Sequence, residues 1–446
     1  MTDGAASLIQ SGSLTEELPQ LQEAFTRLTS RDPAHFWTSG QWMTERRGGS
    51  DVGQSTDTVA LKQEDGSYRL YGYKWFTSAS DADITFTLAR VQDTHGLVTP
   101  GSRGLSMFYL KTQLESEAHN RLELVRLKDK LGTRQLPTAE VLLDGSTAHL
   151  VGIEGRGVAH ISPMLTITRL HNSVISSAYM RRILQLSRDY CTRRTVFGKY
   201  LADQPLHMHT LGQMEVETRG CTLLALETAR LVGLQEAGLA TKSDSLLLRL
   251  LNSINKLYTA KQAVSVISEG LESFGGAAIW RHWSPCLLRD AQVGTIWEGT
   301  TNVLSLDLLR VLQKVGQEIF EVVTDAVKSR LSILPLAHCQ LETEANLIHE
   351  RMQDIVTFVL RAVGEEPECL EVAARDLALS LAHVYISMLL MEQACSGRAT
   401  PSDRVTAQRW CSRPLPLGTL DSYTKSQSAA DLSMVMEGHR LSHTIP

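Results

Sequence analysis

The sequence lacks several features that would assign it to a class at once. Its seven cysteines are scattered and never stand in CxxC spacing, so neither a disulfide framework nor a zinc site is indicated. The formal net charge is −5, which leaves no overall positive field to attract nucleic acid or an anionic membrane. With 43% hydrophobic and 21% charged residues among 446, the chain is typical of a globular protein of two or three domains with reduced thiols.

Targeting and membrane signals are also missing. The first residues, MTDGAASLIQSGSLTEELPQ, are acidic and have no basic region before an apolar one, which argues against a presequence that begins at Met1. The uncharged stretch Leu377–Met391 is interrupted by Ser and His, and it is shorter than the roughly 20 residues that a membrane span needs. We therefore expect a buried helix there, no membrane span, and a cytoplasmic location unless a mitochondrial presequence lies upstream.

Hydrophobic periodicity divides the chain into a β-rich part and a helical part. Alternation of apolar and polar residues predicts strands over 58–62, 68–73, 84–91, 104–110, 123–127 and 140–143. A 3.6-residue period then predicts helices over about 159–190, 206–237, 244–273, 302–329, 341–363 and 367–396, followed by a proline-rich stretch from Pro401 and a short helix near 425–440. The predicted fold class is α+β. Its parts are a short helical segment (1–35), a mainly antiparallel β-barrel or sandwich (36–152), a four-helix bundle (153–315) and an additional helical region (316–446).

One carboxylate stands out in the segment Arg289–Ser305, which reads RDAQVGTIWEGTTNVLS. Glu298 lies between the apolar pair Ile296-Trp297 and a small, hydroxyl-rich turn, just ahead of a predicted helix. Burial against apolar surface raises a carboxyl pKa, and a general base works best when its pKa approaches the working pH. The residues alone leave two interpretations open, a general base and a solvated loop acid.

Two motifs in the β-rich part could contact a planar cofactor. In MTERRGGSDV, the glycine pair ending at Gly49 lies between the hydroxyls of Thr44 and Ser50, and such a loop lets backbone N–H groups approach a ligand or simply forms a tight turn. In YKWFTSA, the indole of Trp75 could stack on or edge a ring system while the next hydroxyl, on Thr77, meets its polar rim. A core Trp-Phe pair is equally compatible with this second motif.

Two motifs in the helical part could meet a phosphate or a cofactor backbone. Arg194, in RRTVFGK, offers a planar fork suited to phosphate, although a solvated basic turn is the ordinary alternative. The glycine pair in ESFGG ends a predicted helix and could admit a cofactor. No metal is expected, because the His207-Met208-His209 pattern does not put both rings on one face of a helix and the His349-Glu350 pair lacks a second histidine.

The order and spacing of these segments resemble the acyl-CoA dehydrogenase family, and specifically its AidB-like branch. The resemblance covers roughly Trp42 to Leu309 and rests on MTERRGGSDV, YKWFTSA, RLKDKLGTR, RRTVFGK, FGG and IWEGTTN in the family's order. It implies a fold that encloses FAD and an acyl-CoA thioester. It also implies that most of the family's N-terminal helical domain is absent, because only about 40 residues precede the first motif.

The resemblance assigns roles to individual residues. Glu298 matches the catalytic base, which removes the α-proton of the thioester as the β-hydride passes to flavin N5. Arg194 matches an arginine that reaches the FAD of a neighbouring subunit, which implies a homodimer or homotetramer. The positions that match the substrate site are Ser50, Arg169 and Gly299. The positions that match the FAD site are Met43, Thr44, Gly49, Ser50, Trp75, Phe76, Thr77, Ser78, Arg194, Phe197, Gly275, Gly276, Trp297, Thr300 and Asn302.

The predicted function is therefore FAD-dependent α,β-dehydrogenation of a fatty acyl-CoA. Electrons would leave to an external acceptor, either an electron-transfer flavoprotein or oxygen, since the chain has no second redox motif. The alternative is a low-turnover regulatory protein that binds flavin or acyl-CoA. DNA protection of the AidB kind is the least favoured function, because residues 316–446 hold 11 Lys and Arg against 17 Asp and Glu and DNA binding needs clustered cations.

Overall fold

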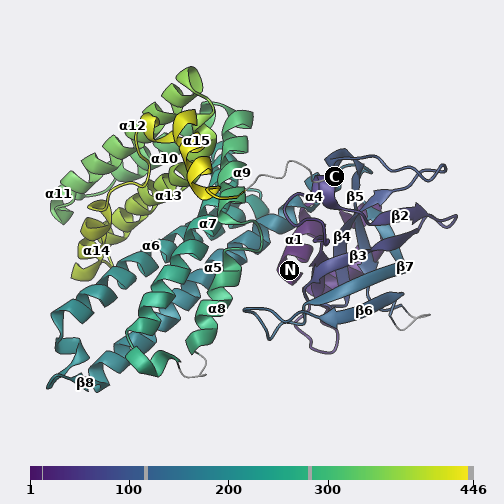
Figure 1. Ribbon diagram of the computed structural model, residues 1–446, viewed down its shortest axis with the longest axis horizontal. Coiled ribbons are helices and arrows are strands. Elements are labelled where there is room, and N and C mark those ends of the chain that lie inside the picture. Colours follow the sequence, from purple (N-terminus) through teal and green to yellow (C-terminus); the bar gives the residue numbers. More distant parts are fainter. Residues whose placement is uncertain (13, 115–118, 280–283, 440–446) are drawn as a thin grey trace. The chain divides into compact units, whose positions relative to one another are not determined.

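The computed structural model describes residues 1–12, 14–114, 119–279 and 284–439. The chain divides into two compact units, Met1–His171 and Asn172–Pro446. In Figure 1 the strands of the first unit run from purple to blue, and the helices of the second run from teal to yellow. The change from strands to helices follows the change in hydrophobic period along the sequence, and the predicted fold class is confirmed.

Short helices open the first unit: α1 (Thr2–Ser11), α2 (Leu14–Glu17) and α3 (Gln20–Leu28). Their apolar side chains, such as Ile9 and Leu21, share one buried cluster with Phe86 and Met107 of the sheet. These helices therefore cover one face of the sheet, because alternate residues of a strand point to the same side.

Within the described residues, seven strands form one sheet. They are β1 (Ser39–Trp42), β2 (Val59–Lys62), β3 (Tyr68–Thr77), β4 (Ile84–Val91), β5 (Leu105–Lys111), β6 (Leu122–Leu127) and β7 (Ala139–Val151). The order β1-β4-β2-β3-β7-β5, with a further pairing of β4 with β5, closes a ring. Leu70, Phe108 and Val141 belong to the second buried cluster, so the middle of the chain forms a small barrel filled by side chains. The pairings are antiparallel except those of β4 with β1 and β2.

The second unit is helical in the residues that are described, apart from the hairpin of β8 (Thr195–Val196) and β9 (Lys199–Tyr200). Helix α5 (Gly157–Arg193) contains the boundary between the units. The helices that follow are α6 (Pro205–Glu236), α7 (Lys242–Glu272), α8 (Ser284–Gly294), α9 (Thr301–Val315), α10 (Glu318–Ser332), α11 (Leu336–Cys339), α12 (Glu342–Glu365), α13 (Cys369–Cys395), α14 (Pro401–Cys411) and α15 (Lys425–Val435). Helix α7 packs against α6, α8 and α9, so it supports the segment that carries Glu298.

The helix predicted over 302–329 was wrong in extent. It is two helices, α9 and α10, which are separated at Gly316, where φ is +75°. This left-handed conformation ends a helix and is easily adopted only by glycine. Helix α14 was missed because Pro401 looks like a helix breaker. Pro401 instead begins the helix, where its missing N–H costs nothing, and Thr400 and Asp403 form a capping box.

Helix α13 is the buried bundle helix that the sequence predicted over Leu377–Met391. Among the described helices it alone is long and apolar enough to cross a membrane, but 83% of its apolar window is buried inside the structure, as in a core helix. Arg330 of α10 holds its end through Glu392, with hydrogen bonds of 2.6 and 2.5 Å. Arg330 also donates to Glu227 of α6 at 2.6 Å. The ionic network thus ties the C-terminal helices to the bundle.

Candidate functional site

The glycine-rich motif and the tryptophan motif lie side by side in the first unit. The backbone N–H of Trp75 donates to the carbonyl of Thr44 at 2.9 Å. Glu45 and Gly48 exchange backbone hydrogen bonds of 3.3 and 3.2 Å, which closes a tight turn and leaves Gly49 exposed. Two of the predicted cofactor motifs are therefore neighbours in space.

A buried ion pair fixes this turn. Lys74 Nζ donates to Glu45 Oε1 at 2.7 Å, and the two side chains are 0% and 4% exposed. Glu45 also accepts hydrogen bonds from the Asp57 N–H at 2.7 Å and the Thr58 hydroxyl at 2.5 Å. Burial alone would raise the pKa of Glu45, but the Lys74 ammonium and these donors hold it below its usual range. Glu45 is thus an ionised structural carboxylate.

Sequence reasoning missed the Lys74–Glu45 pair. The available signal was alternation along β3. Lys74 stands an even number of residues from Tyr68 and Leu70, and all three are buried. A charge at an inward strand position requires a buried partner, because an unpaired buried charge is very costly. The partner, however, comes from another motif, and alternation along one strand does not identify it.

Cations lie over the ring of Trp75. Lys128 Nζ is 3.1 Å from the ring centroid and the guanidinium carbon of Arg46 is 5.5 Å from it. Lys128 also donates to Glu140 at 2.6 Å, and Glu140 accepts the Tyr73 hydroxyl at 2.5 Å. Burial opposes ionisation of Glu140, but hydrogen bonds from Lys128, Tyr73 and a neighbouring arginine lower its pKa to about 2. The ring of Trp75 therefore lies beside two cations, one of which is paired with an ionised carboxylate.

The other predicted residues of the first unit differ in accessibility. Phe76 is 45% exposed, whereas Met43 and Arg169 are half-buried and Ser50 is exposed. The hydroxyl of Ser78 shares a hydrogen bond with another hydroxyl at 3.0 Å.

Thr77 is fully buried, and its hydroxyl oxygen has no hydrogen-bond partner among the described residues. An orphaned buried hydroxyl is unusual and costly. Because Thr77 has no accessible surface, the half-buried Ser78 is the better placed of the two hydroxyls to meet a bound group in this conformation.

Glu298 lies in the second unit, in the turn between α8 and α9. Its φ is +57° and that of Gly299 is +101°, and a left-handed conformation costs a residue other than glycine about 1–3 kcal/mol. A Cβ on Gly299 would stand 2.9 Å from the side chain of Leu304, so this position requires glycine. The side chain of Glu298 is half-buried, while Ile296 is 57% exposed, so only Trp297 of the predicted apolar pair is drawn inward.

Hydrogen bonds hold this turn at several points. Lys256, which is fully buried on α7, donates from Nζ to the Gly299 carbonyl at 2.5 Å. Asn172 of α5 donates to the Gly294 carbonyl at 3.1 Å. The hydroxyl of Thr300 accepts the backbone N–H of Val303 at 3.4 Å and caps α9. Lys256 was not among the predicted site residues, although a lysine on the apolar face of a helix is a signal that can be read from sequence.

The indole N–H of Trp297 is buried and has no hydrogen-bond partner in the part of the chain that the structure describes. It lies next to Glu298, at a position that the resemblance assigns to the cofactor. Asn302 is engaged by Arg375, whose guanidinium donates to its amide oxygen at 3.5 Å. The Thr300 hydroxyl serves as the helix cap, so its predicted cofactor contact would have to share that oxygen.

Arg194 lies directly before the β8–β9 hairpin, and Phe197 lies in its turn. Phe197 and Gly198 have φ of +49° and +78°, the pattern of a two-residue hairpin turn. Phe197 is 99% exposed, which is unusual for a large apolar side chain. Gly275 and Gly276 have open space where a Cβ would stand, so a ligand could approach their backbone.

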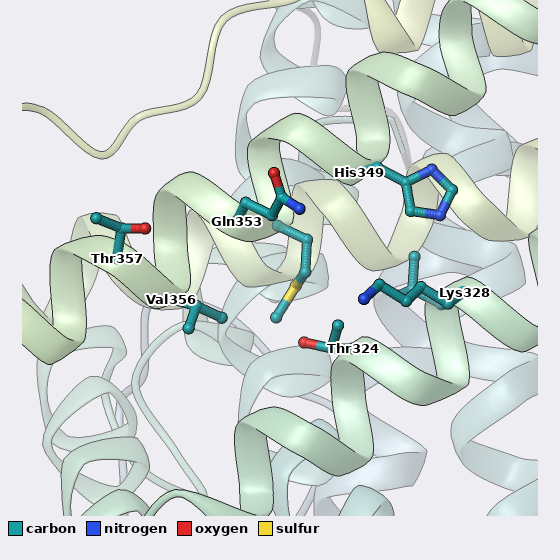
Figure 2. Close-up of a pocket in the computed structure, with 8 residues that line it drawn as sticks. Thr324, Lys328, His349, Gln353, Val356 and Thr357 are labelled. Atoms are coloured by element: carbon teal, nitrogen blue, oxygen red, sulfur yellow. The ribbon is translucent and has the colours of Figure 1, made fainter.

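A groove of about 280 Å³ lies between α10 and α12 (Figure 2). It is lined by Thr324, Val327, Lys328, His349, Met352, Gln353, Val356 and Thr357. None of these is a predicted site residue, and the lining includes no carboxylate that could act as a base. The groove is therefore separate from the chemistry that the motifs indicate.

Comparison with known protein families agrees with the order of the motifs. The model of the acyl-CoA dehydrogenase middle domain matches residues 40–146, and that of the acyl-CoA dehydrogenase C-terminal domain matches residues 155–313. A third model, described as acyl-CoA dehydrogenase 11 C-terminal domain-like, matches residues 318–436.

Individual relatives point the same way. The chain is 47% identical over 417 residues to acyl-CoA dehydrogenase family member 11 of Caenorhabditis elegans, over 92% of this chain and 67% of that protein. It is 33% identical over 351 residues to the putative acyl-CoA dehydrogenase AidB of Escherichia coli, over 78% of this chain and 62% of that protein. The chain thus spans about two thirds of the length of these relatives.

Solved structures share the fold. The crystal structure of C. elegans ACDH-11 in complex with C11-CoA superposes with a TM-score of 0.95 at 45% identity, over 98% of this chain and 74% of that chain. An acyl-CoA dehydrogenase of Bacillus anthracis complexed with FAD has a TM-score of 0.66 at 19% identity, over 90% of this chain and 71% of that chain. The second likeness is one of fold alone.

Proposed function

Because this chain belongs to the acyl-CoA dehydrogenase family, whose members are FAD-dependent oxidoreductases, we propose that it dehydrogenates a fatty acyl-CoA between its α and β carbons. Glu298 is the proposed base that removes the α-proton. The observation that carries the proposal is the setting of this carboxylate, half-buried at a left-handed turn that a glycine and a helix cap complete. The complex of the worm relative with C11-CoA supports a fatty acyl-CoA as the substrate class.

The chemistry requires more than a carboxylate. A thioester α-proton is too weakly acidic for an isolated glutamate, so hydrogen-bond donors must stabilise the charge that develops on the thioester oxygen. One such donor is worth about 3–4 kcal/mol of barrier. The family resemblance gives this role to the backbone N–H of Glu298, which would place the base and the donor on one residue. FAD, when bound, supplies the acceptor for the β-hydrogen as hydride.

Several observations are compatible with a flavin. The ring of Trp75 lies beneath cations, which suits a cofactor that carries phosphates and gains negative charge on reduction. The buried indole N–H of Trp297 lacks an acceptor among the described residues, and Gly275 and Gly276 leave their backbone open. Met43, Thr44 and Ser78 are the proposed contacts beside Trp75.

The exposed hairpin supports a proposal about assembly. Phe197 places a whole aromatic ring in solvent, and large exposed apolar surfaces commonly mark protein interfaces. We infer that this hairpin packs on a second copy of the chain and that Arg194 reaches the cofactor of that copy, as in a homodimer or homotetramer. An electron-transfer flavoprotein or oxygen is proposed as the external electron acceptor that the reaction needs.

The decisive experiment measures flavin reduction by acyl-CoAs in the absence of an acceptor. Purified protein with a visible flavin spectrum should bleach when a fatty acyl-CoA is added anaerobically. Glu298→Gln should bind flavin normally but bleach at least about 100-fold more slowly, because general-base catalysis contributes that much or more. Glu321→Gln changes an exposed carboxylate on α10 and serves as the control.

Two results would contradict the proposal. A stably bound flavin that no thioester reduces would favour the alternative, a binding protein with little turnover. Bleaching at an unchanged rate in Glu298→Gln would mean that another group removes the proton.

A further inference from the structure

We propose that Lys256 is a positioning residue for Glu298: its buried ammonium holds the Gly299 carbonyl and so fixes the turn that directs the carboxylate. The proposal rests on the role of Glu298 as the base. None of the sequence motifs contains Lys256. The proposal concerns how the base is oriented and not which residue is the base.

The burial of Lys256 is the first support. Lys256 is fully buried on α7, in a stretch where Ile254, Asn255 and Leu257 are also buried. An ammonium group loses its hydration there, so it must be compensated by close polar partners. Its Nζ donates to the Gly299 carbonyl at 2.5 Å, a charge-assisted hydrogen bond of the stronger kind. A neutral side chain of similar length would fill this volume without that cost, so packing alone does not explain a lysine here.

The conformation of the turn is the second support. Glu298 has a φ of +57°, a region that residues with a Cβ rarely adopt. Such a residue relaxes to an ordinary conformation unless its surroundings hold it. The carbonyl bound by Lys256 belongs to Gly299, the next residue. When that carbonyl is held, the peptide plane between Gly299 and Thr300 cannot rotate freely, and this restricts the rotations by which the backbone at Glu298 could relax.

Two other side-chain hydrogen bonds of this segment act at its ends. Asn172 holds the Gly294 carbonyl at the end of α8. Thr300 caps α9 with a long hydrogen bond of 3.4 Å. Of these bonds, the one from Lys256 lies closest in the chain to Glu298, and it is also the shortest. We therefore expect its removal to disturb the base while the helices remain formed.

The test replaces Lys256 by Met, which keeps the length of the side chain but removes the donor. Lys261→Met is the matched control, because Lys261 is an exposed lysine on the same helix. We expect Lys256→Met to bind flavin and to keep its KM for acyl-CoA, while kcat falls by about 10- to 100-fold, the size of effect produced by a base displaced by about 1 Å. Lys256→Arg, which retains a donor, should recover part of the loss.

A second readout separates positioning from a general loss of activity. Exchange of the α-hydrogens of a saturated acyl-CoA with solvent deuterium, followed by mass spectrometry, reports proton removal without requiring net oxidation. In Lys256→Met this exchange should slow by the same factor as kcat. A residue that only stabilises the fold would instead reduce the fraction of protein that holds flavin, and it would leave exchange per bound flavin unchanged.

The outcomes distinguish this inference from the proposed function. If Glu298→Gln keeps both exchange and turnover, Glu298 is not the base, and its positioning by Lys256 is overturned with it. If Glu298→Gln is inactive while Lys256→Met matches Lys261→Met in kcat and exchange, only the positioning role is overturned. If neither Lys256→Met nor Lys256→Gln holds flavin, Lys256 serves the fold of the bundle and the positioning role is again overturned.

Discussion

Two buried lysines support two of the motifs that contain a glutamate, and they do so in different ways. In the first unit, Lys74 is paired with the carboxylate of Glu45 itself at 2.7 Å. In the second unit, Lys256 holds a backbone carbonyl, that of Gly299, one residue from the carboxylate of Glu298. The first lysine fixes a side chain as an ionised part of the core. The second fixes the backbone from which the side chain projects.

The difference suggests which glutamate can take part in chemistry. Glu45 is 4% exposed, and its oxygens are occupied by Lys74 and by hydrogen bonds from Thr58 and Asp57. A carboxylate in that setting stabilises the fold and cannot reach a substrate. Glu298 is half-buried at a turn. We therefore expect the loss of Glu45 to be measured chiefly in unfolding experiments and the loss of Glu298 in kinetics.

The strongest test of this comparison is Glu45→Gln. Removing one partner of a buried ion pair leaves the other charge uncompensated, which costs about 3–5 kcal/mol. We expect that loss in the free energy of unfolding of the first unit, measured by denaturant titration. Glu64→Gln, in the exposed hairpin turn between β2 and β3, should cost less than about 0.5 kcal/mol. If Glu45→Gln were as stable as the control yet lost turnover, Glu45 would take part in the reaction and would not serve chiefly to stabilise the fold.

Lowering the pH should reduce the free energy of unfolding by less than Glu45→Gln does, because a protonated Glu45 keeps part of its hydrogen bonding. The folded pKa of Glu45 lies below its ordinary value of 4.5, so its contribution is fully present above that value and is lost as the pH falls through the folded pKa. Each unit of depression corresponds to about 1.4 kcal/mol. The stability of the wild type relative to the double variant Glu45→Leu, Lys74→Met should therefore fall as the pH drops below 4.5. A difference that stays constant down to the acid transition would show that the pair is not ionised.

The fold was largely accessible from sequence because its elements follow local patterns. Apolar and polar residues alternate along most of β4, and this strand was predicted with the correct bounds, Ile84–Val91. The failures occurred where one residue decides between two structures. Gly316 interrupts an apolar period that otherwise runs through α9 and α10, and Pro401 begins a helix that it was expected to prevent.

The candidate site was predicted less completely because its support comes from residues distant in the sequence. Motif order identified Glu298, Trp75 and Arg194, and these roles stay predictions. It could not identify Lys256 as the partner of the Gly299 carbonyl, since 43 residues separate them along the chain. Nor could motif order indicate that Thr77 would be buried. Alternation along a strand does not show how deeply the last residue of that strand is buried in the barrel.

The smallest expected effect on stability concerns Thr300, the helix cap beside Glu298. Its hydroxyl accepts the Val303 N–H at 3.4 Å, so Thr300→Ala should cost about 0.5–1 kcal/mol, the lower part of the range for an N-cap. Thr424 caps α15 with the same 3.4 Å geometry, and Thr424→Ala should cost a similar amount. If backbone support orients the base, only Thr300→Ala will also lower kcat, although the two variants unfold alike. Equal kcat in both variants would mean that the cap of α9 does not orient Glu298.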